Sequence, residues 1–294
     1  MSTILCPVDF SESSDAAVDL AVAAAYARGS RLALLHVDPP PTTAERLLSS
    51  DNYKTLRRQH DEWLESRLAT ARLRLNNETE VDAISRLKRG APADQIIDVA
   101  TELGVELIVM ASHSSRLRRA LLGSVAERVA RAAPCPILLA RGETYAEIPF
   151  KRLLLCIDFT SLSHAVIAKA LKMSDEHAHI ELLHVVDEPS VTALQASLGE
   201  QGEVVSLIDT LHKDARHRLE KFTAELPITT KPPQQTVIGG PIAATILSRA
   251  AESKADLIVV GSHRPHGLKQ RLVGTVADRI LHHAEIPVLL CPAS

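Results

Sequence analysis

Two glycines frame a polar loop near the end of the chain, between an apolar run and a helical pattern. The loop begins at Gly261, directly after Leu257–Val260, and closes at Gly274-Thr275, directly before Val276–Leu281. Helix N-termini carry free backbone N–H groups and a partial positive charge, so they bind anions. Glycine lets a ligand approach the backbone without a Cβ in the way. The pattern predicts a phosphate site, and the alternative is a structural loop with an ordinary helix start.

The same arrangement occurs earlier in the chain in a less complete form. The apolar run Leu107–Met110 is followed by a polar loop and then by Gly123-Ser124 at the start of a helical pattern. His113 and His263 stand at matched positions in the two loops, where we expect solvated or phosphate-facing side chains. A function for this protein has to account for a loop that is built twice.

Two acids, Asp9 and Asp158, each follow an apolar strand pattern at matched positions of the two halves. Short acids after strands often serve as helix caps or turn residues. A carboxylate at the edge of a sheet can also accept hydrogen bonds from a ligand. The repetition favours the ligand interpretation, although two copies of one segment would share a cap as well.

These residues are positioned by a regular alternation of strands and helices. In the first half we expect strands at 4–9, 32–37, 81–87, 107–110 and 136–140, and helices at 16–28, 44–75, 92–103 and 124–132. In the second half we expect strands at 153–158, 182–186, around Pro232-Pro233, 257–260 and 286–291, and helices at 163–173, 191–226, 241–252 and 276–281.

This order predicts an α/β protein with two tandem Rossmann-like domains, each a doubly wound parallel five-stranded sheet with helices on both faces. We expect the domains at 1–142 and 150–294, because the segment between them lacks periodicity. Ligands of such sheets bind beyond the carboxyl ends of the strands, where the strand order reverses. The two acids and the two loops all follow strands at those ends.

Composition narrows the function classes. Hydrophobic content of 46% with 23% charged residues is typical of a globular protein, and the net charge of −3 argues against a general nucleic-acid binder. No apolar stretch approaches the roughly 18 residues that span a bilayer, and the start of the sequence does not resemble a signal peptide. We expect a cytoplasmic protein without a membrane segment. The four cysteines lie in or beside predicted strands, which favours buried reduced thiols.

Common catalytic and metal-binding motifs are absent from the sequence. It contains no Gly-x-Ser-x-Gly elbow, no Gly-x4-Gly-Lys-(Ser/Thr) loop and no His-Glu-x-x-His pair. His263 and His266 could be drawn as a metal pair, but no third ligand lies nearby in the sequence. We therefore predict no catalytic residue and no metal held by protein side chains.

At this level of detail the chain resembles a tandem universal stress protein, with two family domains in one polypeptide. In the first half the resemblance rests on the segments Ile4–Ser14, Leu35–Val37, Gly123–Val129 and Ala133–Leu139. In the second half it rests on Cys156–Thr160, His184-Val185, Gly261–His263, Gly274–Arg279 and Ile286–Leu290. Together these segments extend over nearly the whole chain.

The resemblance implies an ATP site with defined residue positions. ATP-binding members carry a loop of the form Gly-x2-Gly-x9-Gly-(Ser/Thr), which holds ribose and phosphates. The acid after the first strand and the backbone after the second hold the adenosine. In the second half this implies Asp158 and Val185 for the adenosine, and a loop set for ribose and phosphates that consists of Gly261, His263, Arg264, Gly274 and Thr275.

The two halves depart from the family loop to different degrees. The second half keeps the spacing but has Arg264 in place of the middle glycine, and this guanidinium could either pair with phosphate or block its approach. In the first half Ala111 and Ser114 replace both early glycines, and the loop is one residue short. The first-half counterparts Asp9, Val37, Gly123 and Ser124 are therefore expected to form a degenerate site, with ATP bound mainly by the second domain.

The leading hypothesis is a cytoplasmic stress-response protein that binds ATP with Mg²⁺ and acts as a switch, with at most slow ATPase activity. The first alternative is a scaffold that has lost both sites and acts through dimerisation and partner contacts. A related adenine-nucleotide hydrolase is the weaker alternative, because its Ser-Gly-Gly-type loop after the first strand is missing. The resemblance also implies pairing of the last strands, Pro136–Ala140 and Pro287–Cys291, in a homodimer or an intramolecular pseudo-dimer.

Overall fold

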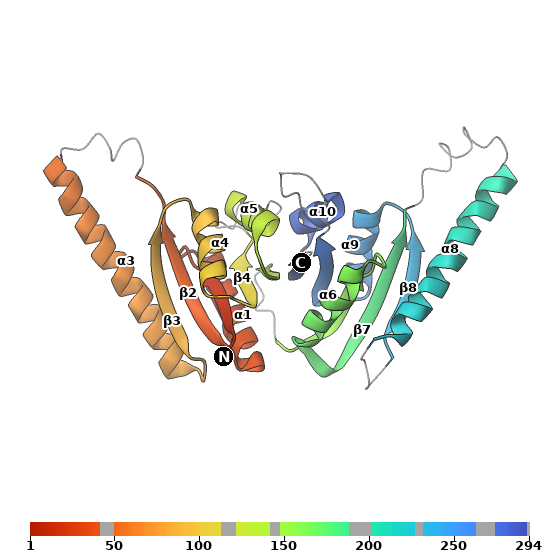
Figure 1. The fold of residues 1–294 in the computed structure, drawn as a ribbon, viewed down its shortest axis with the longest axis horizontal. Coiled ribbons are helices and arrows are strands. Elements are labelled where there is room, and N and C mark those ends of the chain that lie inside the picture. Colours follow the sequence, from red (N-terminus) through yellow and green to blue (C-terminus); the bar gives the residue numbers. More distant parts are fainter. Residues whose placement is uncertain are drawn as a thin grey trace. The chain divides into compact units, whose positions relative to one another are not determined.

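The computed structural model describes residues 1–41, 50–112, 122–141, 148–187, 201–226, 232–262 and 274–292. The chain divides into two compact units, Met1–Ile148 and Pro149–Ser294. Each unit is a parallel sheet with flanking helices, which confirms the predicted α/β class with tandem Rossmann-like domains (Figure 1).

The first unit contains five strands and four described helices in alternation. The strands are β1 (Thr3–Pro7), β2 (Arg31–Asp38), β3 (Ala83–Arg89), β4 (Leu107–Ala111) and β5 (Ile137–Ala140). The helices are α1 (Glu12–Arg28), α3 (Ser50–Glu78), α4 (Pro92–Glu102) and α5 (Ser124–Ala132). The strand order β3-β2-β1-β4-β5 reverses between β1 and β4, so the carboxyl ends of these two strands flank the switch point.

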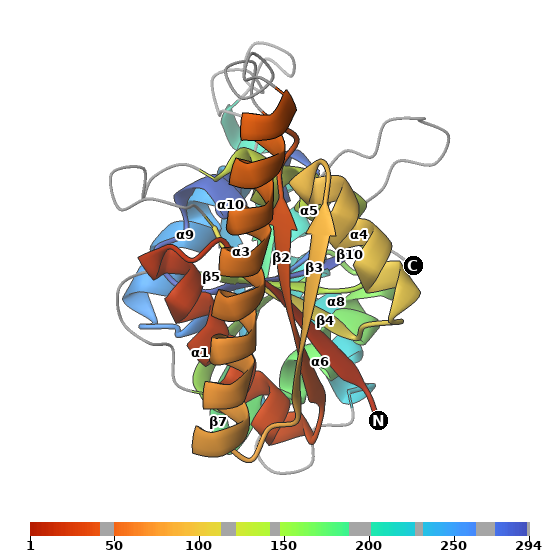
Figure 2. The same cartoon turned by 90° about the vertical axis from the view of Figure 1, so that its left-hand side faces the viewer.

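The central strands of this sheet are buried on both faces, as their continuous apolar runs predict. Leu5 of β1 pairs with Ala33 of β2 and with Ile108 of β4, and all three side chains are fully buried. Helix α1 ends at Gly29, which adopts a left-handed conformation with φ of 58°. The long helix α3 runs beside the edge formed by β2 and β3 (Figure 2).

The second unit repeats this plan. Its strands are β6 (Phe150–Cys156), β7 (Ser174–Val186), β8 (Gln234–Gly239), β9 (Leu257–Ser262) and β10 (Val288–Pro292). Its described helices are α6 (Ser161–Leu171), α8 (Gln201–Ala224), α9 (Ile242–Glu252) and α10 (Thr275–His283). The order β10-β9-β6-β7-β8 places β6 and β9 side by side, as β1 and β4 are in the first unit.

Strand boundaries are where the sequence expectations were least accurate. Strand β7 begins at Ser174 rather than near Leu182, because its first residues are polar and present no apolar run. Strand β3 lies two residues later than expected, and β8 starts only after Pro233, since proline cannot donate to the ladder. The predicted helix starts at 44 and 191 lie outside the described residues, whereas α5 has the predicted bounds.

The first unit carries a cluster of charged side chains where α3 meets the ends of β2 and β3. We call it the α3 charge cluster, and its members are Asp38, Arg57, His60, Asp61 and Arg89. Asp38 is buried and forms an ion pair with Arg57, and its Oδ1 lies 3.4 Å from Nε2 of His60. Asp61 lies between Arg57 and Arg89, at 3.9 and 2.5 Å.

The second unit has no counterpart of the α3 charge cluster at the same positions. Asp38 corresponds to Val186, because the carbonyl of each accepts a hydrogen bond from the glycine that follows the next strand, Gly90 or Gly240. In the matching elements of the second unit, Arg57 corresponds to Ile208, His60 to Leu211, Asp61 to His212 and Arg89 to Gly239.

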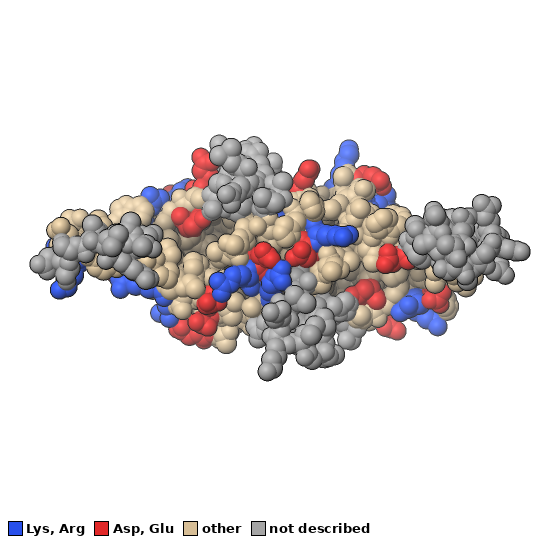
Figure 3. Space-filling model, turned by 90° about the horizontal axis from the view of Figure 1, so that it is seen from above, with Lys and Arg blue, Asp and Glu red and all other residues tan. Residues whose placement is uncertain are grey.

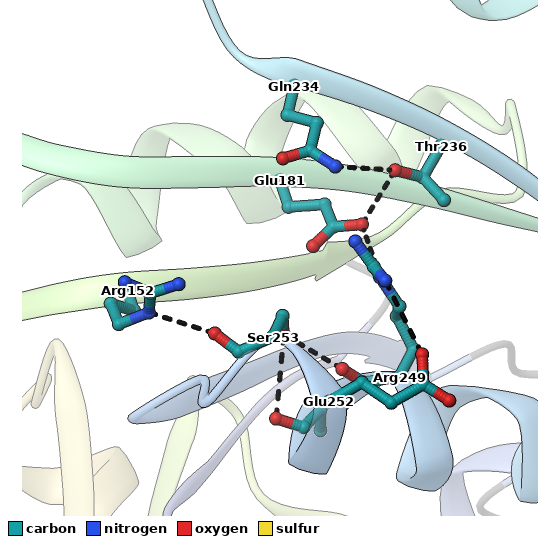
Figure 4. Close-up of polar contacts among 8 residues, drawn as sticks. Arg152, Glu181, Gln234, Thr236, Arg249, Glu252 and Ser253 are labelled. Atoms are coloured by element: carbon teal, nitrogen blue, oxygen red, sulfur yellow. Dashed lines mark hydrogen bonds and ion pairs between the residues drawn. The ribbon is translucent and has the colours of Figure 1, made fainter.

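A buried ion pair occupies the sheet of the second unit instead. Glu181 of β7 is 1% exposed, and its Oε1 accepts hydrogen bonds from Thr236 Oγ1 at 2.6 Å and Arg249 Nε at 2.7 Å (Figure 4). Its Oε2 has no hydrogen-bond partner among the described residues. The corresponding positions of the first unit hold the buried apolar residues Ala33 and Val99.

Candidate functional site

A cavity of about 330 Å³ opens at the switch point of the first unit. Its walls come from the residues after β1, the end of β2, the end of β4 and the first turn of α5. They include all four site residues predicted for this unit, namely Asp9, Val37, Gly123 and Ser124, together with His36 and Ser112. The volume is at the small end of the range found for small-molecule sites.

Asp9 takes part in a local turn through its carboxylate and also lines the cavity. Its Oδ1 accepts hydrogen bonds from the backbone N–H of Ser11 at 3.0 Å and from the Ser11 hydroxyl at 2.6 Å. Ser11 in turn caps α1 by accepting a hydrogen bond from the N–H of Ser14. Asp9 also lines the cavity, and no described residue donates to its Oδ2. The turn and ligand interpretations of this acid are therefore compatible.

The first turn of α5 presents unpaired backbone donors to the cavity. The N-cap residue Gly123 makes no side-chain capping hydrogen bond, and the residues Gly123–Ala126 line the cavity. The first N–H groups of a helix have no partner within the helix, and the helix dipole adds positive potential there. This end of the cavity is suited to a phosphate or another anion.

Ser112 is a cavity residue that the sequence interpretation missed. It is 1% exposed, and its hydroxyl has no hydrogen-bond partner among the described residues, although its carbonyl accepts a hydrogen bond from Gly123 N–H at 2.7 Å. Buried hydroxyls are normally paired, so an orphan in a cavity wall points to a ligand or water partner. The repeat was the available signal, because Ser262 occupies the matched position after Gly261 and is also buried.

The predicted residues of the second unit lie at the equivalent sheet edge. Asp158 follows β6, Val185 lies near the end of β7, and Gly261 lies in β9, paired with Cys291 of β10. Asp158 Oδ1 accepts hydrogen bonds from the Thr160 N–H, the Thr160 hydroxyl and the Ser163 hydroxyl, at 3.0, 2.7 and 2.9 Å. This repeats the turn geometry of Asp9.

Gly274 is the N-cap of α10, Thr275 is the first residue of that helix, and no side chain caps it. Gly274 has an ordinary φ of −55°, and a Cβ added there would meet no described atom within 4 Å. Neither backbone strain nor packing against described residues thus requires a glycine. Close approach of a ligand would be a reason for its presence. The predicted residues His263 and Arg264 lie outside the described residues.

Histidines at the ends of the second strands each form a hydrogen bond with a backbone carbonyl. His36 Nδ1 lies 2.7 Å from the carbonyl of Val8, and His184 Nδ1 lies 2.8 Å from that of Ile157. Burial lowers the pKa of His184, although its hydrogen bond to Ile157 acts in the opposite direction. The neutral imidazole is therefore favoured, with its Nδ1 proton donated to the carbonyl.

The cysteines are suited to packing rather than chemistry. None of the four forms a disulfide, and three of them are buried. Burial raises the pKa of the Cys6 and Cys156 thiols well above the ordinary value, and raises that of Cys291 to about 12. Since the thiolate is the reactive form, these side chains remain protonated and unreactive at neutral pH.

The described part of the chain contains no group of three or more His, Cys, Asp or Glu side chains that could hold a metal ion. It also contains no helix long and apolar enough to cross a membrane. On the face shown in Figure 3, acidic and basic side chains are interspersed with neutral residues.

Comparison with known proteins identifies the family and the fold. The sequence model of the Universal stress protein family matches residues 1–141 and 149–292. The chain is 28% identical over 219 residues to the universal stress protein Rv2005c of Mycobacterium tuberculosis, which covers 71% of this chain and 69% of that protein.

It is also 32% identical over 146 residues to universal stress protein A homolog 1 of Coxiella burnetii, covering 48% of this chain and 94% of that protein. Among solved structures, a universal stress protein from Archaeoglobus fulgidus matches 99% of this chain and 98% of its own, with a TM-score of 0.71 at 19% identity. This structural likeness concerns the fold.

Proposed function

Since the chain belongs to the universal stress protein family, we propose that it is a cytoplasmic stress-response protein that binds an adenine nucleotide and acts as a switch or regulator. The proposed ligand is ATP accompanied by Mg²⁺, bound mainly by the second unit. Asp158 and Val185 would hold the adenosine. The ribose and phosphates would contact a loop set that consists of Gly261, His263, Arg264, Gly274 and Thr275.

The observation that carries this proposal is the cavity of the first unit. It joins an acid, an uncapped helix N-terminus and an orphaned buried hydroxyl at the switch point of a doubly wound sheet. The second unit has the same elements in the same order, with Asp158, Gly274 and Ser262 at the matched positions. The described elements that surround the cavity of the first unit thus have counterparts in the second unit.

The chemistry of these groups fits an adenine nucleotide. A carboxylate such as that of Asp9 or Asp158 accepts hydrogen bonds from ribose hydroxyls or from the amino group of adenine. The N–H groups at the start of α5 or α10 donate hydrogen bonds to phosphate oxygens. The Ser112 hydroxyl can also donate a hydrogen bond to a phosphate oxygen. Apolar wall residues such as Val37 exclude water from one face of a planar base.

Preference for the second unit rests on its more complete loop. Gly261 and Gly274 keep the family spacing there, whereas Ala111 and Ser114 replace both early glycines of the first unit. Thr275 adds a hydroxyl to the backbone donors of the α10 N-terminus. The proposal includes Arg264 as a residue near the phosphates, so a variant without this arginine belongs in the same series.

The test is to identify any nucleotide released from freshly purified protein and then to titrate Mg-ATP by calorimetry. Gly274→Val fills the second site and Gly123→Val fills the first, so the two variants form a matched pair. We expect micromolar binding in the wild type, lost largely in Gly274→Val and only slightly in Gly123→Val. No released nucleotide and no binding by the wild type would contradict the proposal.

Arg264→Ala and omission of Mg²⁺ refine the ligand assignment. Weaker binding by the arginine variant would support phosphate pairing, and tighter binding would show that the guanidinium blocks the site. We expect phosphate release to be far slower than the roughly 1–10³ s⁻¹ typical of enzymes, as suits a switch. Turnover within that range would place the protein among the hydrolases instead.

A scaffold is the second candidate function, and exposed apolar side chains on the long helices favour it. Leu56 and Trp63 of α3 are each 48% exposed, and Leu207 and Leu211 of α8 are each 40% exposed. Large exposed apolar side chains of this kind mark partner contacts in many proteins. The scaffold would replace the nucleotide switch if neither unit bound ATP.

Location and assembly complete the proposal. Four cysteines that form no disulfide are consistent with a reducing compartment, which supports the cytoplasm. The predicted pairing of the last strands, 136–140 and 287–291, stays a prediction, as do the homodimer and the pseudo-dimer that it would form. Sedimentation of the purified protein over a range of concentrations would measure the number of chains in the assembly.

A further inference from the structure

Two phenylalanines, one in each unit, adopt a left-handed backbone conformation directly after the candidate acids. Phe10 follows Asp9 with φ of 61°, and Phe159 follows Asp158 with φ of 60°. A bulky residue in this region is a genuine outlier, because its Cβ approaches the carbonyl oxygen. Such strain persists only where the surrounding structure enforces it, and it often marks a functional site.

A histidine ring holds each phenylalanine from the second strand. The rings of Phe10 and His36 stack with centroids 4.8 Å apart, and those of Phe159 and His184 lie 4.4 Å apart. Each histidine is itself fixed by a hydrogen bond to the carbonyl two residues before the phenylalanine. Each histidine therefore joins the second strand of its unit to the turn that follows the first strand and carries the acid.

An arginine from the long helix completes each group. The guanidinium carbon of Arg67 in α3 lies 4.8 Å from the centroid of the Phe10 ring, and that of Arg218 in α8 lies 4.4 Å from the Phe159 centroid. These distances are within the range of cation–π attraction. The long helix thus contacts the strained residue directly in both units.

The strained residue lies between the acid and a hydrogen-bond partner of that acid. Across Phe10, the backbone N–H of Ser11 donates to Oδ1 of Asp9 at 3.0 Å. Across Phe159, the backbone N–H of Thr160 donates to Oδ1 of Asp158 at the same distance. If the phenylalanine relaxed to negative φ, the chain would turn differently and these bonds would be lost. The orientation of the carboxylate then depends on the contacts that keep φ positive.

We propose that Arg67 and Arg218 are positioning residues, which hold Phe10 and Phe159 in the left-handed conformation and thereby orient Asp9 and Asp158 toward the ligand. This inference rests on the proposed nucleotide site. It gives the long helices a defined role, because any displacement of α3 or α8 would change the orientation of the acid's carboxylate in the same unit. The same contacts among phenylalanine, histidine and arginine occur in both units.

The first test measures affinity. Arg218→Met keeps most of the apolar stem and removes the cation. Because Arg218 is exposed, we expect Mg-ATP to bind the second unit about twofold to fivefold more weakly. Arg218→Lys should recover most of the affinity. The matched control is Arg216→Met, an exposed arginine on the same helix, which should bind as the wild type does. In the first unit Arg67→Met is compared in the same way with Arg58→Met, whose arginine pairs with Glu62.

A double variant separates positioning from general support of the fold. Glycine adopts positive φ without penalty, so Phe159→Gly no longer needs the arginine. We expect Arg218→Met to have no further effect on affinity in the Phe159→Gly background. An equal loss in both backgrounds would mean that Arg218 acts elsewhere, and the proposal would be wrong.

The second test needs no ligand. Hydrogen exchange of the Thr160 and Ser11 amides, resolved by NMR, should become faster in Arg218→Met and Arg67→Met respectively and remain unchanged in the controls. A wild type that binds no Mg-ATP would overturn the proposed function, and the exchange measurement would then decide the positioning role alone. Unchanged exchange and unchanged affinity in both arginine variants would overturn the inference while leaving the nucleotide site intact.

Discussion

Two buried serines in the wall of the same cavity differ in what their hydroxyls do. Ser14 accepts a hydrogen bond from the backbone N–H of Asp9 at 3.3 Å, whereas the hydroxyl of Ser112 has no partner among the described residues. A buried hydroxyl without a partner costs stability, while a paired one contributes to it. The Ser14 hydroxyl therefore stabilises the fold, whereas the Ser112 hydroxyl is available to a ligand.

Replacing these serines should have opposite effects on the free energy of unfolding. We expect Ser112→Ala to raise it by about 1 kcal/mol, because an unsatisfied buried group is removed, and Ser14→Ala to lower it by about 1 kcal/mol. Urea unfolding followed by tryptophan fluorescence measures both. A loss of stability in Ser112→Ala would show that its hydroxyl is paired in the folded protein and would weaken its assignment to the ligand.

Glu106 gives the first unit a pH-dependent contribution to stability. It accepts hydrogen bonds from Arg28 at 3.2 and 3.1 Å and from the Ser30 hydroxyl at 2.6 Å. Burial alone would raise the pKa of this carboxyl, but the hydrogen bonds from Arg28 and Ser30 outweigh it, so the pKa is lowered from its ordinary value of 4.5. A lowered folded-state pKa stabilises the protein above the unfolded value and ceases to do so as the pH falls.

The matching prediction concerns Glu106→Gln. At pH 7 we expect the substitution to lower the free energy of unfolding by about 1 kcal/mol, because a charge-assisted pair becomes a neutral one. The difference from wild type should shrink as the pH falls from about 5 to about 3, where the wild-type carboxyl becomes protonated. Denaturant unfolding at a series of pH values measures it, and a difference that grew toward acid would contradict the assignment.

At the residue scale, the sequence was sufficient for side chains whose position follows from a strand end. Asp9, Val37, Gly123 and Ser124 were predicted as counterparts within one site, and the structure brings them to one cavity. Their role toward a ligand stays a prediction. The positive φ of Phe10 could not be predicted, because it results from contacts with residues far away in the sequence.

At the scale of elements, the accuracy of the prediction differed from one element to the next. Helix α4 begins at Pro92, as its proline predicts, and α5 has the predicted bounds, whereas α1 begins at Glu12, four residues before the expected start. Strand β7 was predicted at less than half of its length, because its first residues are polar. Its pairing with β6 begins at Ser174, shifts register and resumes at His179, ahead of the apolar run that the sequence shows.

The ion pair of Glu181 and Arg249 tests how one element is fixed to another. Arg249→Val leaves a buried carboxylate with only Thr236 as partner, and we expect a loss of about 3 kcal/mol in the free energy of unfolding. The double variant Glu181→Ala with Arg249→Val copies the residues of the first unit, Ala33 and Val99. It should recover more than half of that loss, because no buried charge remains.

Circular dichroism during urea unfolding measures these variants, and the first unit is the internal reference because it is unchanged. A double variant as unstable as Arg249→Val alone would show that the pair does more than neutralise its own charges. Glu181→Ala alone should lie between the two, since Arg249 keeps its contact with Glu252 at 3.4 Å.

At the scale of the molecule, a single tryptophan distinguishes the two units. Trp63 is the only tryptophan, it belongs to α3, and its ring lies 6.0 Å from that of Phe10. Its fluorescence therefore follows the first unit, while circular dichroism follows both. The chain need not unfold in a single step, because it contains two compact units.

This difference allows the preferred site to be located without any substitution. Mg-ATP at a hundred times its Kd should stabilise the unit that binds it by about 2.7 kcal/mol. We expect the unfolding transition seen by circular dichroism for the second unit to move to higher urea, and the transition of Trp63 to move much less. A shift of the Trp63 transition as large as the other would place equally strong binding in the first unit.

The α3 charge cluster has a consequence for how a duplicated chain folds. Two similar units made in one polypeptide can exchange equivalent elements before either is complete. If α3 packed on the strands of the second unit, Arg57 would face Val186 and His60 would lose Asp38. If α8 packed on the first unit, Asp38 would be buried beside Ile208 and would lose its ion pair with Arg57. Each exchange leaves a charge without its partner, so the difference between the repeats directs each long helix to its own sheet.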